Sequence, residues 1–248
     1  ALLRRTLQAL DTRREGSKLD GLIGYTGFVG SNLLQQHDFG RLYNSANIAD
    51  LADQSFETLV CAAAPGSMFE ANRFPERDSE RISALIQQLD AVGPVQRFVL
   101  ISTVAVLAGF KAESEDGTAF ETATPYGVNR RRLETFVAER FPHALIVRLP
   151  ALFGSGLKKN FLFDLLNPMP SMVPPAGLAQ LEDSVGPSLA PRVRAFYPFE
   201  DRLGMHVVDR ASLDQSADLN ALETAVRQAG LSALRFTNPN SQFQFYDM

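Results

Sequence analysis

The sequence contains no tryptophan, one cysteine, three histidines and no long apolar run. The single Cys61 cannot form an internal disulfide, which favours a reducing, cytoplasmic setting. His37, His143 and His206 show no metal-ligand spacing with one another or with Cys61, so we expect no bound metal. No apolar run approaches the roughly 20 residues that span a bilayer. A net charge of -4 also offers no basic field for nucleic acid or an anionic membrane surface.

The 248 residues, 45% of them hydrophobic, are enough for one large domain with a smaller companion. Apolar runs alternate with segments of helical periodicity, which predicts an α/β fold in which helices cover a parallel sheet. We expect strands within 18–24, 41–46, 57–64, 96–103 and 143–154, and helices within 31–37, 75–92, 126–140 and 216–230. Ser31 or Asn32 is expected near the cap of the first of these helices.

Three other segments are harder to assign. Residues 1–18 place Leu3, Leu7 and Leu10 on one helical face, so we expect an N-terminal helical extension. Residues 167–191 are rich in proline, glycine and serine with weak periodicity, which is typical of an irregular loop or lid. The final "SQFQFYDM" is strand-like.

The stretch "GLIGYTGFVGSNLL" places Gly24, Gly27 and Gly30 between a strand and a helix. Glycines at this spacing permit a tight turn, let a pyrophosphate approach the backbone and allow close packing of helix on sheet. The alternative is a glycine-rich turn without a ligand. The small-residue run "CAAA" at the end of a later strand favours dinucleotide binding, because it leaves room for a close approach. After the second strand, Asn44 could hydrogen-bond the ribose of either NAD or NADP, and the lack of a basic residue in the glycine loop favours NAD.

The stretch "TPYGVNRRRLETF" places Tyr126 at the start of a helix and Arg130 one turn later. Two interpretations stay open. Tyr126 is a proton-transfer residue with a cation beside it, or it is an ordinary aromatic residue ahead of a solvated basic face that includes Arg131 and Arg132.

From about residue 19 onward, the chain resembles the extended short-chain dehydrogenase/reductase family of the NAD-dependent epimerase/dehydratase type. The matching motifs stand in the family's order: "GYTGFVG", "DL" at 50 and 51, "CAAA", "IST" and "YGVNR". The resemblance implies a Rossmann-like doubly wound parallel sheet, with a dinucleotide-binding domain over 19–156 and a small substrate lobe over 157–248. That lobe ends early, so either the sequence is a piece of a longer chain or the lobe is reduced.

The resemblance also implies the roles of individual residues. Thr103 would hydrogen-bond the substrate oxygen, Tyr126 would be the general acid/base, and Arg130 would stand where the family has a lysine that lowers the tyrosine pKa. With Asn44, the expected cofactor contacts are Gly24, Thr26, Gly27, Phe28, Val29, Gly30, Asp50, Leu51, Ala62, Ala63, Ala64 and Pro150.

The chain departs from the family at several positions. Arginine is bulkier and more planar than the lysine it replaces. Val104 and Ala105 stand where the family's dehydratases carry an acidic pair, which argues against dehydration. Asp78 replaces a usual asparagine, and we expect it to be a surface acid.

These observations predict an NAD(P)-dependent oxidoreductase or epimerase that acts on a nucleotide-linked sugar. The alternatives are a dinucleotide-binding sensor or scaffold protein with little turnover, and an enzyme on a small carbonyl compound without a nucleotide. The resemblance further implies a homodimer, formed through the helices over 78–90 and 126–140.

Overall fold

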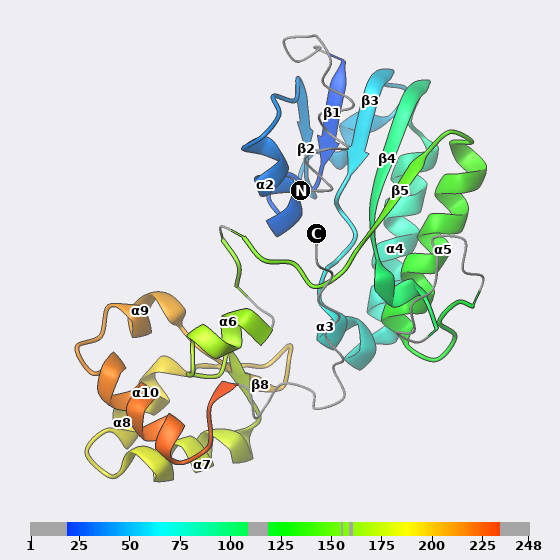
Figure 1. The fold of residues 1–248 in the computed structure, drawn as a ribbon. Coiled ribbons are helices and arrows are strands. Elements are labelled where there is room, and N and C mark those ends of the chain that lie inside the picture. The colour runs from blue at the N-terminus through cyan, green and yellow to red at the C-terminus, as the bar shows by residue number, and fades with distance from the viewer. Residues whose placement is uncertain (1–18, 109–118, 155, 159–160, 234–248) are drawn as a thin grey trace. The chain divides into compact units, whose positions relative to one another are not determined.

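The computed structural model describes residues 19–108, 119–154, 156–158 and 161–233 (Figure 1). The expected N-terminal helix and the strand-like 241–248 lie outside these ranges. The chain divides into two compact units between residues 155 and 156. No helix within the described ranges is both long enough and apolar enough to cross a membrane.

The first unit is a five-stranded parallel sheet with helices on both faces. Its elements are β1 (Asp20–Ile23), α2 (Phe28–Leu34), β2 (Arg41–Tyr43), a 3-10 turn (Ile48–Leu51), β3 (Phe56–Cys61), α3 (Met68–Arg73), α4 (Pro75–Asp90), β4 (Val95–Thr103), a 3-10 turn (Val104–Val106), α5 (Pro125–Arg140) and β5 (Leu145–Leu149). The strand order is β2-β1-β3-β4-β5, and every neighbouring pair is parallel. The predicted doubly wound, Rossmann-like α/β fold is therefore confirmed.

Two apolar layers hold the sheet between its helices. On one face, α4 and α5 lie side by side (Figure 1), and Ile82, Leu85 and Leu89 of α4 are buried at helical spacing against β3 and β4. On the other face, Leu33 of α2 packs on Leu22 and on the neighbouring strands. Burial on both faces explains why the second half of β3 (59–61) and the middle of β4 (98–101) are continuous apolar runs.

The second unit has its own core and a small antiparallel sheet of order β6-β8-β7. Its elements are α6 (Phe161–Leu166), β6 (Met172–Val173), α7 (Pro175–Val185), α8 (Ala190–Phe196), β7 (Phe199–Glu200), β8 (Met205–Val207), α9 (Arg210–Asp214) and α10 (Leu219–Gln228).

The expectation of an irregular loop over 167–191 is wrong. The segment contains β6, all of α7 and the start of α8, and Leu178, Leu181 and Val185 of α7 are buried at helical spacing. Pro175 and Pro191 lie in the first turns of α7 and α8, where a missing backbone N–H costs nothing. These prolines start helices, whereas the composition had suggested that they interrupt structure.

Candidate functional site

The glycine loop joins β1 to α2, and two of its glycines are required by the packing of the backbone. Gly24 has a φ of 86°, and a Cβ there would lie 2.6 Å from the carbonyl oxygen of Ala62. A Cβ on Gly30 would lie 2.1 Å from the carbonyl oxygen of Gly24. Only glycine allows the loop, β3 and α2 to approach this closely.

Gly27 is different, because nothing in the fold requires a glycine there. It is exposed, its φ of -77° suits any residue, and the nearest atom to an added Cβ is the Gly24 carbonyl oxygen at 3.4 Å. The missing side chain leaves the outer surface of the loop open, which fits a ligand that approaches the backbone closely. Since α2 begins at Phe28 with Gly27 as its cap, Ser31 lies inside the helix and donates to the Phe28 carbonyl oxygen; the cap expected at Ser31 or Asn32 is wrong.

The loop lies where the order of the strands reverses, between β1 and β3. In open α/β sheets, ligands bind at the carboxyl ends of the strands at this switch point. The partly buried Ala62, Ala63 and Ala64 follow β3 here, and the Ala62 N–H donates to the carbonyl oxygen of Ile23. The alanine run therefore lies beside the glycine loop, as a shared dinucleotide site would require.

The other residues that are expected to contact the cofactor differ in how exposed their side chains are. Asn44 shapes the turn after β2, because its Oδ1 accepts from the Ala46 N–H at 2.9 Å and its Nδ2 donates to the Tyr25 hydroxyl at 3.1 Å. Asp50 is exposed, whereas the side chain of Leu51 is fully buried, so Leu51 can offer a ligand only its backbone. Thr26 is exposed; Phe28, Val29 and Pro150 are partly buried.

The two expected catalytic hydroxyl groups lie together. Thr103 ends β4, Tyr126 lies in the first turn of α5, and the Thr103 hydroxyl is close enough to the phenol to lower its pKa. The start of α5 is close to the turn after β4, since a Cβ on Gly127 would lie 2.4 Å from the Ala105 carbonyl oxygen. The Tyr126 backbone N–H donates to Oδ1 of Asn72 in α3 at 3.0 Å. Sequence reasoning missed these supports of Tyr126, because they come from distant segments.

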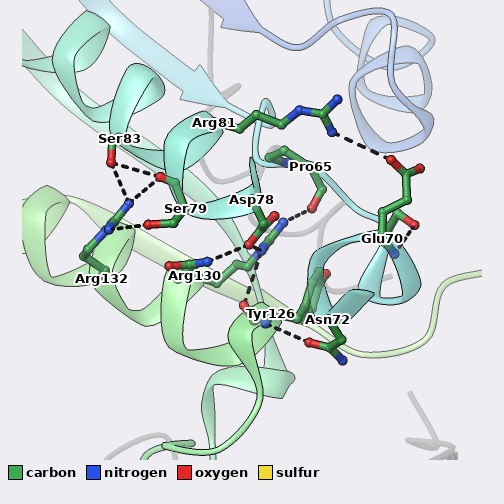
Figure 2. A network of polar contacts seen from close by, with 12 residues as sticks. Pro65, Glu70, Asn72, Asp78, Ser79, Arg81, Ser83, Tyr126, Arg130 and Arg132 are labelled. Atoms are coloured by element: carbon green, nitrogen blue, oxygen red, sulfur yellow. Dashed lines mark hydrogen bonds and ion pairs between the residues drawn. The ribbon is translucent and has the colours of Figure 1, made fainter. Parts of the chain in front are cut away.

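Arg130 is buried, with 2% of its surface exposed, and does not belong to a solvated basic face. Figure 2 shows it between Asp78 of α4 and Pro65, which follows β3. Nη1 donates to Oδ2 of Asp78 at 2.5 Å, and Nη2 donates to the Pro65 carbonyl oxygen. The guanidinium carbon lies 4.1 Å from the centre of the Tyr126 ring, a cation–π contact.

Asp78 is likewise buried, and the expectation of a surface acid is wrong. Only 4% of its surface is exposed, and Oδ2 also accepts from Nδ2 of Asn129 at 2.8 Å. One carboxylate thus holds two successive residues of α5. A charge can be buried in this way only when it is paired, and α4 supplies the acid that Arg130 needs.

Burial raises the pKa of the Tyr126 phenol above its ordinary value. Arg130 and the Thr103 hydroxyl act in the opposite direction, and Asp78 raises the pKa further. The net direction is opposite to the one expected from Arg130 alone, because the cation is paired and the ring is removed from water.

A second buried network, centred on Glu134, ties α5 to the last two strands. Glu134 is fully buried and accepts from the Ser102 hydroxyl at 2.7 Å, from both Nε and Nη2 of Arg148 and from Nη1 of Arg131. Ser102 precedes Thr103, so this network holds the end of β4 against α5. The signal in the sequence is the spacing of four between Tyr126, Arg130 and Glu134, which puts all three on one helix face.

The described residues therefore form a doubly wound, Rossmann-like fold with an open glycine loop and a threonine–tyrosine pair at the same edge of the sheet. No family description and no curated protein sequence matches the chain.

Several solved structures are similar to the chain over part of its length. MoeE5 in complex with UDP-glucuronic acid and NAD is 22% identical over 60% of each chain, with a TM-score of 0.45. RMD from Pseudomonas aeruginosa, complexed with NADPH, is 19% identical over 67% of this chain and 61% of its own, with a TM-score of 0.47. A dTDP-4-dehydrorhamnose reductase from Yersinia enterocolitica is 15% identical over 59% of this chain and 58% of its own, with a TM-score of 0.47.

The chain spans about three fifths of the length of these structures. They are of the NAD-dependent epimerase/dehydratase and reductase type, the type that the sequence resembles. The strand order of the chain itself, and not these partial matches, establishes its Rossmann-like fold.

Proposed function

We propose that this protein is an NAD(P)-dependent oxidoreductase or epimerase that acts on a nucleotide-linked sugar, with Tyr126 as its acid/base. The observation that carries the proposal is the pairing of Thr103 with Tyr126 at the sheet edge that also holds the glycine loop. A hydroxyl pair at this edge can hold a carbonyl or alcohol oxygen and exchange a proton with it.

The residues present fit a nicotinamide dinucleotide. Gly24 and Gly30 build the loop, and Gly27 leaves its outer surface open where a Cβ would otherwise stand. Gly27, Ala62 and their neighbours would hold the phosphates and the first ribose, and the bound cofactor would supply a hydride. Tyr126 would hold or give up the proton on the substrate oxygen, and Thr103 would orient that oxygen. The turn at Asn44 does not distinguish NAD from NADP, so both belong to the proposal, with NAD favoured by the uncharged glycine loop.

The proposed substrate class rests on the ordered motifs of the sequence, because glycine loop, strand-end threonine and helix-start tyrosine recur together in enzymes of nucleotide sugars. UDP-glucuronic acid and UDP-glucose, which accompany NAD in the similar MoeE5 structures, are suitable first probes. The substrate lobe would be the second unit, which starts at residue 156.

The test is a fluorescence titration of the purified chain with NADH and NADPH, followed over time with a panel of nucleotide 4-keto sugars. Binding and consumption by wild type, with both cofactors bound more weakly by a Gly27→Ala variant, would support the proposal. In Tyr126→Phe, consumption should fall by a factor of about 100 or more while cofactor binding remains, because one positioned acid contributes roughly 10²–10⁴-fold. If neither NADH nor NADPH binds, the proposal is refuted.

A second candidate, a dinucleotide-binding sensor or scaffold with little turnover, is favoured by the engagement of Arg130 in a buried ion pair. It predicts binding of the cofactor without consumption, and equal binding by wild type and Tyr126→Phe.

A cytoplasmic location and a homodimer through α4 and α5 belong to the first proposal, the oxidoreductase or epimerase. Sedimentation equilibrium decides the dimer, since a monomer at micromolar concentration would contradict it.

A further inference from the structure

The ion pair beneath Tyr126 suggests which direction of the proposed reaction the site serves. Arg130 lies over the tyrosine ring, with its guanidinium carbon 4.1 Å from the ring centre. It is held there from α4 by Asp78 and from the loop after β3 by the Pro65 carbonyl oxygen. The charge of the cation is therefore partly offset where it meets the ring, and both of its Nη groups donate to protein atoms, whereas its buried Nε has no hydrogen-bond partner among the described residues.

Apart from this ion pair, the described groups that act on the phenol are polar and uncharged. Among the described residues, the charged groups that act on it are Arg130 from its own helix and Asp78 from α4. β4 contributes the Thr103 hydroxyl, and α3 contributes the amide of Asn72, which binds the Tyr126 backbone. The nearby carboxylate of Glu121 accepts hydrogen bonds from the backbone N–H groups of Ala123 and Thr124.

We propose that Asp78 is a positioning residue that cancels part of the charge of Arg130 beneath Tyr126, so that the buried tyrosine enters the reaction as a neutral phenol and the site serves the reduction of a carbonyl compound. The inference rests on the proposed function. In the reduction, one proton and two electrons pass together as a hydride from a reduced nicotinamide dinucleotide to the carbonyl carbon. The phenol O–H bond of Tyr126 breaks, a new O–H bond forms on the substrate oxygen, and the phenolate regains a proton from water. Oxidation of an alcohol, with which an epimerase begins, would instead need the phenolate at the start.

The direct test is a set of charge variants read by the ultraviolet absorbance of phenolate, without cofactor. Subtraction of Tyr126→Phe isolates the Tyr126 signal from the other four of the five tyrosines. Asp78→Asn should give roughly tenfold more Tyr126 phenolate at a given alkaline pH, since it leaves a nearby cation uncompensated. Arg130→Gln should give less phenolate, and Asp78→Asn with Arg130→Gln should titrate at the pH of wild type or above it, because Arg130 acts on the phenol more strongly than Asp78 does. Arg132→Gln, which removes an exposed charge from the same helix, should change nothing.

Charge cancellation is refuted if Asp78→Asn titrates like wild type, or if the double variant titrates at clearly lower pH than wild type. The double variant keeps the test decisive if Asp78→Asn does not fold, because it leaves no unpaired buried charge.

The pH dependence of turnover tests the protonation state of Tyr126 in the reaction. Wild type should reduce a nucleotide 4-keto sugar at a constant rate up to alkaline pH, and Asp78→Asn should lose that rate at lower pH, because its neutral phenol ionises earlier. Equal pH profiles of reduction in the two proteins would overturn the inference while leaving the proposed function intact. If neither cofactor binds, the proposed function fails, and the phenolate titration alone decides the role of Asp78.

Discussion

Gly27 and Gly30 offer a test that separates ligand binding from folding within one short loop. In Gly30→Ala, the new methyl group would lie 2.1 Å from the Gly24 carbonyl oxygen and 2.7 Å from the Tyr25 Cα. Both neighbours are backbone atoms, so α2 has to move by roughly 1 Å away from the loop. Overpacking of this kind costs about 1–3 kcal/mol. At the middle of that range, the melting temperature of a chain of this size falls by about 4–8 °C.

Gly27→Ala should leave the fold almost unchanged. The position has ordinary backbone angles, and the added Cβ meets its nearest atom at 3.4 Å. Alanine is a poorer helix cap than glycine, but it also reduces the entropy of the unfolded chain by about 0.4–1 kcal/mol. These terms oppose each other, and we expect a net change of stability within about 1 kcal/mol. The methyl group would however stand on the open surface of the loop, so the Kd for NADH and NADPH should rise roughly ten- to a hundredfold.

The assay pairs thermal unfolding with fluorescence titration of both cofactors. Gly186→Ala is the control, because Gly186 lies at the end of α7 with a φ of 78° and open space around it. That variant should lose stability through backbone strain and keep its affinity for the cofactor. If Gly27→Ala binds both cofactors as tightly as wild type, the glycine loop is not the phosphate site. Unchanged stability of Gly30→Ala would refute the packing analysis of the loop.

Three further predictions concern other buried groups of the first unit. Gly127→Ala should lower stability by about 1–3 kcal/mol and reduce turnover more than cofactor binding, because the new Cβ would push α5 away from the Ala105 carbonyl oxygen; urea unfolding and kinetics on the same sample check this. Glu134→Gln should cost about 1–3 kcal/mol in urea unfolding, since it removes the fully buried carboxylate that accepts hydrogen bonds from two partly exposed arginines, and a loss below about 0.5 kcal/mol would contradict the network. Burial raises the pKa of Cys61 to about 11, so the native thiol should not react with a thiol reagent at neutral pH. Because the folded thiol keeps its proton longer than the unfolded one, the free energy of unfolding should fall by about 2–3 kcal/mol as the pH rises from about 9 to 11, and a Cys61→Ala variant should lack this component.

Local patterns predicted most of the elements of the first unit. A strand that is buried on both faces is an apolar run, and a helix that covers one face repeats its apolar residues every three or four positions, as in α4. The prediction of an irregular loop over 167–191 failed because it gave the proline and glycine content more weight than the positions of the prolines. A proline in the first turn of a helix and a proline in a loop cannot be told apart by counting prolines.

The candidate site divides in the same way. The sequence determined the residue types that the chemistry needs, their order and their spacing: the three glycines, Thr103 at a strand end, and Tyr126 one turn before Arg130. These features are local, because they depend on the periods of a helix and a strand.

Only the tertiary structure decided what those residues do to one another. Asp78 and Arg130 are 52 residues apart in the chain, and only the packing of α4 on α5 brings them together and removes both from water. The burial of the Tyr126 phenol, and not the sign of the residue at position 130, sets the direction of the Tyr126 pKa. A charge in a sequence has a known sign, but its effect depends on the distance to its partner and on the water around it, and both exist only in the folded chain.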